Sequence, residues 1–301
     1  MTAVATLQAT QARTDQVKAI ARDARRERTR MLGLIVPALV ILAVVLLTPL
    51  GWLMWQSVIG PEGLTAMHYR RILDDVGYHN SFWLTFEISG LVTILAILIG
   101  YPLSYMLSRL KPIWAGVGIG LVIIPFWNSL LVRTYAWMLL LQRKGLINDA
   151  LVDLGIVEKP LALMHNFTGT TIGMLHIMLP FMVLPLYATM RRIDGELLLA
   201  AANLGASPRY AFWRVFFPLS KPGLMAGTLL VFVLCLGFYI TPELLGGGRT
   251  IMISMLIARN VELYFEWGAA SSVAMVVLVL VLAVFWLFSR VLAVERVFGA
   301  R

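Results

Sequence analysis

Six stretches of the sequence are long and apolar enough to cross a lipid bilayer, and no other feature limits the fold as strongly. A transmembrane helix needs about 20 apolar residues to span a hydrocarbon core about 30 Å thick. Because the chain is 59% hydrophobic and only 14% charged over 301 residues, a soluble domain of this size would leave much apolar surface exposed. We predict an all-α integral membrane protein with about six transmembrane helices, at residues 31–58, 81–108, 113–141, 169–190, 222–243 and 268–289.

Positive charge is distributed unevenly between the two sides that these spans define. With the N-terminus inside, the inner segments hold 17 of the 25 Lys and Arg residues, and such residues collect at cytoplasmic helix ends. We therefore expect a multi-pass membrane protein with both termini in the cytoplasm. The net charge of +9 is explained by this topology, so no nucleic-acid partner is expected. The predicted division is a basic cytoplasmic segment at 1–30 and a transmembrane domain at 31–301.

The sequence lacks the motifs of the common catalytic and metal sites. Its four histidines form no HExxH pattern, which argues against a zinc site. No GxxxxGK[ST] run occurs, and the three glycines at 246–248 have no lysine after them. The chain is therefore expected to bind no cofactor and to hydrolyse no nucleotide itself.

The longest predicted cytoplasmic connection, residues 191–221, has the pattern of two short helices joined by a fixed bend. Asp194 is suited to cap the first helix, and Gly205 to end it. Ser207 and Pro208 are suited to start the second helix. We expect that second helix to expose a large apolar surface, which needs a protein partner or a lipid interface, formed by Tyr210, Phe212, Trp213 and Phe216.

This loop resembles the signature of ATP-binding-cassette (ABC) importer permeases. The signature has the form EAA, three residues, G, nine residues, a branched apolar residue, one residue, then LP. Its spacing is matched by Ala200, Ala201, Gly205, Val215 and Pro218. The sequence departs from it at Leu199, which stands where the glutamate is expected, and at Phe217, which replaces the leucine. Glu196 lies one helical turn before Leu199 and is a candidate replacement for the missing carboxylate.

The resemblance implies that residues 191–221 are a coupling loop, which docks on a separate ATPase whose closure moves the transmembrane helices. A purely interfacial helix is the alternative. The residues implied for coupling are Glu196, Leu199, Ala200, Ala201, Gly205, Pro208, Phe212, Val215 and Pro218. The resemblance further implies a type I importer permease (MetI-like) fold and a location in the bacterial inner membrane. It also implies a second permease subunit as heterodimer partner, two ABC ATPases that use ATP and Mg, and an external solute-binding protein.

Three further segments resemble the spermidine/putrescine branch of these permeases, specifically the subunit with the longer basic N-terminus. They are GYPLSY at 100–105, the segment from PFW to TYAW at 125–137, and TPELLGG at 241–247. The resemblance implies import of a small cationic solute, a polyamine. Another small solute, such as an amino-acid derivative or an organophosphonate, is the alternative within this class. An ion-coupled secondary transporter is the rival class, and it would show internal repeats instead of a structured loop.

Candidate residues for the substrate pathway are few. Glu87 lies within the second predicted span, where it either pairs with an ammonium group of the solute or forms a structural pair with Arg133. Glu243, at the outer mouth, either binds the cation or is a solvated loop carboxylate. Three aromatic residues either offer faces for cation–π contact or anchor helix ends at the membrane interface, namely Trp127, Tyr135 and Trp137.

Overall fold

The computed structural model describes residues 27, 31, 33, 35–60 and 63–298, with side chains up to residue 290. It divides into two compact units, Met1–Trp55 and Gln56–Arg301. The predicted basic segment at 1–30 lies outside the described residues except for Glu27. What is described of the first unit belongs chiefly to one apolar helix, Ile35–Val58.

Five helices among the described residues are long and apolar enough to cross a membrane, and a bent pair of helices supplies a sixth candidate. The long helices are Ile35–Val58, Val76–Arg109, Phe167–Arg191, Pro208–Leu236 and Trp267–Arg290, and the pair is Pro112–Trp127 with Leu130–Asp153. The prediction of an all-α membrane protein with about six spans is confirmed.

The third predicted span, 113–141, is wrong as a continuous helix. The chain forms α4 (Pro112–Ile123) and one 3₁₀ turn, η1 (Ile124–Trp127), then breaks before α5 (Leu130–Leu141) and α6 (Leu146–Asp153). Asn128 and Ser129 adopt extended backbone, and the axis bends by 97° between the two halves. Pro125, inside the 3₁₀ turn, lacks a backbone N–H, so helical hydrogen bonding is weakened just before the break.

The fifth predicted span, 222–243, begins earlier and ends earlier than expected. The second helix of the 191–221 loop does not stop, because α9 (Pro208–Ala211), the π-helical turn η2 (Phe212–Phe216) and α10 (Phe217–Leu236) follow one another without a gap. At the other end, α10 stops before Gly237. A separate short helix, α11 (Ile240–Gly246), follows and contains Pro242.

Helices α3 (Val76–Arg109), α7 (Phe167–Arg191) and α10 pack against one another. Glycines allow the close approach, since a Cβ at Gly100 would lie 2.8 Å from Met182 Cγ and one at Gly227 would lie 2.8 Å from Met182 Sδ. Small residues have this role in many membrane helix interfaces. The core between the three helices includes Ile88, Val92, Ala96, Met174, Met178, Met182, Leu186, Val231 and Cys235.

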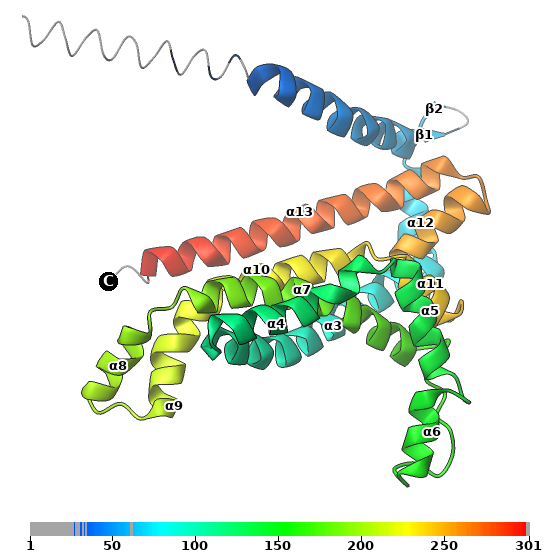
Figure 1. The fold of residues 1–301 in the computed structure, drawn as a ribbon. Coiled ribbons are helices and arrows are strands. Elements are labelled where there is room, and N and C mark those ends of the chain that lie inside the picture. The colour runs from blue at the N-terminus through cyan, green and yellow to red at the C-terminus, as the bar shows by residue number, and fades with distance from the viewer. Residues whose placement is uncertain (1–26, 28–30, 32, 34, 61–62, 299–301) are drawn as a thin grey trace, which may run out of the picture. The chain divides into compact units, whose positions relative to one another are not determined.

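Short elements occupy the two ends of the packed helices (Figure 1). One end carries α8 (Gly195–Asn203) and α9, and the opposite end carries α5, α6, α11 and α12 (Ile253–Glu262). A two-residue ladder, β1 (Ile59–Gly60) with β2 (Gly63–Leu64), precedes α2 (Met67–Asp74). An ion pair between Arg71 and Glu266 links α2 to the residue before α13 (Trp267–Phe298).

Candidate functional site

Helix α8 is fixed at its start by a side-chain cap. Asp194 Oδ1 accepts a hydrogen bond from the main-chain N–H of Glu196 at 2.9 Å, which satisfies one of the free donors of the first turn. Glu196 lies in that turn, where a carboxylate is favoured by the helix dipole. The predicted cap is therefore present, and it sets where α8 leaves the end of α7.

The other end of α8 is closed by a glycine in the left-handed region. The N–H of Gly205 donates to the carbonyl of Ala202 at 2.9 Å, and the N–H of Ala206 donates to the carbonyl of Ala201 at 3.0 Å. This pair of bonds defines a Schellman motif, and it requires the φ of +84° at Gly205. The bend after α8 thus follows from hydrogen bonds of the chain itself.

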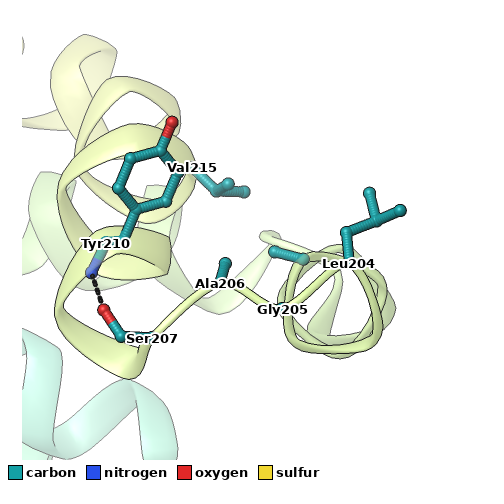
Figure 2. Close-up of a pocket in the computed structure, with 7 residues that line it drawn as sticks. Leu204, Gly205, Ala206, Ser207, Tyr210 and Val215 are labelled. Carbon is teal, nitrogen blue, oxygen red and sulfur yellow. Dashed lines mark hydrogen bonds between the residues drawn. The ribbon is translucent and has the colours of Figure 1, made fainter.

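The second helix begins at Pro208 with a hydroxyl cap. Ser207 Oγ accepts from the N–H of Tyr210 at 3.3 Å, as the dashed line in Figure 2 shows. Pro208 occupies the first helical position, where its missing N–H costs nothing. Both helix starts and the helix end predicted for the 191–221 loop are confirmed.

The bend borders an apolar hollow, here called the Gly205 hollow (Figure 2). It has a volume of about 650 Å³ and is lined by Ala201, Leu204, Gly205, Ala206, Ser207, Tyr210 and Val215. Leu204 is 89% exposed beside it, and Leu199 on α8 is 66% exposed. An exposed apolar surface of this kind is typical of a contact with another protein.

A second hollow, here called the Tyr105 hollow, lies between α8 and the end of α3. It measures about 630 Å³ and is lined by Tyr105, Arg109, Gly195, Leu198, Leu199, Ala202, Ala206, Pro208, Ala211, Phe212 and Phe216. Residues of α3 therefore face the 191–221 loop, although more than 80 positions separate them in the sequence. The sequence contained no local signal for this arrangement.

The aromatic residues of the loop divide between surface and interior. Tyr210 and Trp213 are 57% and 55% exposed, as expected. Phe216 is only 1% exposed and Phe212 is half-buried, because both pack against Tyr105 of α3. The prediction that all four side chains form one exposed surface is wrong for these two.

At the opposite end of the helices, the predicted pathway residues lie apart. Trp127 is 88% exposed and Tyr135 is 52% exposed, while Trp137 is half-buried with its ring 5.6 Å from that of His176. Glu87 lies on an exposed side of α3. Among the described residues, no hydrogen bond, ion pair or ring contact links any two of the five predicted pathway residues.

Arg133 does not pair with Glu87 within the described part of the chain. Its Cζ lies 5.6 Å from the ring centre of Phe126. Its Nε and Nη1 atoms are buried with no hydrogen-bond partner among the described residues. The alternative in which Glu87 serves as the structural partner of Arg133 is therefore wrong.

Glu243 lies in the first turn of α11 and is half-buried. Burial, together with the nearby negative charges of Glu243 and Glu262, raises the pKa of the Tyr239 hydroxyl, and Arg259 opposes this effect. The electrostatic influence of both carboxylates therefore reaches the segment between α10 and α11. Glu262 and Tyr239 were not predicted as site residues, because α12 reaches the segment between α10 and α11 only in the folded chain. There Ser254 Oγ donates to the carbonyl of Phe238 at 2.6 Å.

Known proteins with similar sequences decide the family. No protein-family model matches the chain. It is 34% identical over 250 residues to the spermidine/putrescine transport system permease protein PotB of Haemophilus influenzae, covering 82% of this chain and 85% of the relative. The chain belongs to the PotB family of transport permeases. The resemblance seen in the 191–221 loop and in the three further segments is thereby confirmed.

Other members of the PotB family and related permeases give the same result. PotB of Escherichia coli is 34% identical over 231 residues, which are 76% of this chain and 84% of the relative. The inner membrane ABC transporter permease protein YdcU of Escherichia coli is 32% identical over 240 residues, covering 68% of this chain and 75% of the relative. The chain is thus a multi-pass inner-membrane permease of the ABC transporter class.

A solved structure shows that the PotB-family fold is shared more widely. A bacterial alginate ABC transporter, crystallised with an alginate pentasaccharide-bound periplasmic protein, superposes with a TM-score of 0.71. The match covers 89% of this chain and 94% of that chain at 16% sequence identity. A likeness at this identity concerns the fold alone, and it confirms the predicted importer-permease architecture.

The nine residues predicted for coupling in this PotB-family chain lie in one region. Ala201, Gly205 and Val215 line the Gly205 hollow, and Leu199, Pro208 and Phe212 line the Tyr105 hollow. The remaining three are exposed and border neither hollow, namely Glu196, Ala200 and Pro218. Their role in coupling stays a prediction.

Proposed function

We propose that this chain is the transmembrane permease subunit of an ATP-driven importer that moves a polyamine, a spermidine- or putrescine-like cation, into the cytoplasm. The observation that carries the proposal is 34% identity to permeases named for spermidine and putrescine transport over most of both chains. The outer-end carboxylates Glu243 and Glu262 are consistent with a cationic solute, since negative charge at a mouth raises the local concentration of cations.

The 191–221 loop is the proposed contact with the ATPase. Its helix α8 is fixed at both ends and presents exposed leucines beside an apolar hollow. A rigid projection of this kind transmits displacement better than a flexible tether does. In this proposal, α8 and the start of α9 fit a groove of a cytoplasmic ABC ATPase, whose closure displaces the loop.

The proposal assigns the remaining tasks to other subunits. Two ATPase subunits use ATP and Mg, and this chain binds no cofactor of its own. A second permease subunit completes the pathway as a heterodimer partner, and an external solute-binding protein delivers the polyamine. The topology predicted from the sequence assigns seventeen basic residues to the inner segments, which include the 191–221 loop. On that basis the loop and both termini are proposed to face the cytoplasm.

Reconstitution tests this function. The chain is placed in vesicles with its second permease subunit, the ATPase and the binding protein, and uptake of labelled spermidine is followed with and without ATP. We expect uptake only with ATP and with the ATPase present. Accumulation by the chain alone under an ion gradient would overturn the proposal in favour of a secondary transporter. ATP-dependent uptake of an organophosphonate or an amino-acid derivative instead of spermidine would correct the solute.

A further inference from the structure

Two side chains of α3 contact the π-helical turn η2, which lies in the second helix of the 191–221 loop. The ring of Tyr105 meets those of Phe212 and Phe216 edge to face, with centroids 5.4 and 5.0 Å apart. The guanidinium of Arg109 lies over both Phe216 and Tyr105, with Cζ at 4.9 and 5.4 Å from the ring centres. We call these four residues, Tyr105, Arg109, Phe212 and Phe216, the clamp.

The π-helical turn η2 brings both phenylalanines of the clamp to the same side. The N–H of Phe217 donates to the carbonyl of Phe212, which is the wide five-residue spacing of a π turn. The rings of Phe212 and Phe216 consequently stack, 5.8 Å apart and inclined by 19°. Single π turns inside α-helices often occur at functional positions, and here the turn allows Tyr105 to contact two rings.

Further contacts tie the same end of α3 to its neighbours. Arg191, at the end of α7, donates from Nη1 to the carbonyls of Ser108 and Leu110, at 3.0 and 3.3 Å. These carbonyls belong to the last turn of α3 and the residue after it, where a basic side chain is favoured by the helix dipole. One turn before Tyr105, the Tyr101 hydroxyl is hydrogen-bonded to Ser220 Oγ at 2.8 Å.

The path from α8 to α3 runs through the clamp. Helix α8 packs on α9 and η2, whereas the Tyr105 hollow lies between α8 and the α3 side chains Tyr105 and Arg109. A displacement of α8 would therefore be passed to η2 through direct contact. Phe216, which is 1% exposed, would pass it on to Tyr105. Tightly packed contacts of this kind pass on displacement because they do not compress.

We propose that the clamp is a positioning device that converts movement of the 191–221 loop into movement of α3. This inference rests on the proposed function, since it names residues that carry the coupling of the same importer. None of the four clamp residues is among those predicted for the substrate pathway, and the chain has no nucleotide-binding motif. Substitution of the clamp residues should therefore uncouple ATP hydrolysis from transport. The assembled complex should still hydrolyse ATP.

The test measures spermidine imported per ATP hydrolysed in the reconstituted complex. Tyr105→Leu removes both edge contacts and one cation–π contact. Arg109→Gln removes the guanidinium from an exposed position. We expect each to lower this ratio about five-fold while ATP hydrolysis stays within about two-fold of wild type. Tyr105→Phe, which retains the ring, is expected to restore the wild-type ratio.

Met106→Ala is the matched control, because Met106 lies between the two α3 clamp residues in sequence and is 53% exposed. An unchanged ratio in both Tyr105→Leu and Arg109→Gln would overturn the clamp, and so would an equal drop in the control. If Tyr105→Leu fails to assemble, the Arg109→Gln ratio decides. A wild-type complex that hydrolyses ATP without importing spermidine would instead contradict the proposed function. The proposed role of the clamp would then be rejected as well.

Discussion

The main-chain N–H of Ala206 donates to the carbonyl of Ala201 across the end of α8, at 3.0 Å. This bond forms because Gly205, between them, adopts a φ of +84°. A Cβ at this glycine would meet no atom within 4 Å, so any cost of substitution comes from the backbone or from new charge. Position 205 is therefore a site where the loop can be altered without disturbing a packed core.

Gly205→Asp is predicted to uncouple ATP hydrolysis from uptake. The new carboxylate would lie at the apolar Gly205 hollow, where an unpaired charge opposes docking of a protein partner. Gly205→Asn is the control, because asparagine has the same shape without the charge and also tolerates positive φ. We expect uptake per ATP to fall about ten-fold for Asp and less than about three-fold for Asn. Normal coupled transport by the Asp variant would count against docking at this bend.

Asp194→Ala is predicted to loosen the start of α8. Loss of a capping side chain costs about 1 kcal/mol, and Asp194 Oδ1 is the acceptor for the Glu196 N–H. Hydrogen exchange of the α8 amides should therefore rise about five-fold. Asp194→Asn keeps an equivalent acceptor and should exchange like wild type. Equal protection in the Ala and Asn variants would show that the cap is not what holds this helix.

Glu243→Gln is predicted to weaken uptake of a cation while the complex still assembles. Removing one of the two carboxylates near Tyr239 lowers the attraction for an ammonium group. The KM for spermidine should rise about five-fold, with little change in kcat. Glu158→Gln removes the same charge from an exposed position elsewhere and should change neither value. Undiminished uptake at low spermidine would remove Glu243 from the pathway.

Gly223→Ala is predicted to destabilise the packing of α10 on α7. A Cβ there would lie 2.5 Å from Thr189 Oγ1 and 2.8 Å from the carbonyl oxygen of Pro185, and overpacking of this kind costs about 1–3 kcal/mol. Thermal unfolding in detergent should show a lower midpoint. Gly116→Ala in α4 meets nothing within 4 Å and should unfold at or slightly above the wild-type temperature. A midpoint for Gly223→Ala equal to that of Gly116→Ala would contradict this account.

Features set by neighbouring residues were predictable from the sequence. Asp194, Gly205 and Ser207 act through main-chain groups at most five positions away, so their residue types suffice to place the ends of α8 and the start of α9. The apolar spans were predictable for the same reason, because hydropathy is summed over one continuous segment.

Features that depend on distant segments were missed. The burial of Phe216 requires Tyr105 and Arg109 of α3, and periodicity within the loop contains no information about that helix. The electrostatic effect of Glu262 on Tyr239 likewise depends on how α12 packs against the segment between α10 and α11. The break at Asn128 was missed because mean hydropathy across 113–141 stays high although the chain direction changes by 97°.

The π turn at Phe212–Phe216 also determines how α8 and α9 are rotated about the axis of α10. An α-helix advances about 100° per residue, and the extra residue held in this turn offsets the faces of α9 from those of α10 by about that angle. Deleting one residue from this turn would remove that rotation. The bend at Gly205 and α8 would then lie on a different side of α10. The number of residues in this turn therefore determines the orientation of the 191–221 loop, just as their identity determines its contacts.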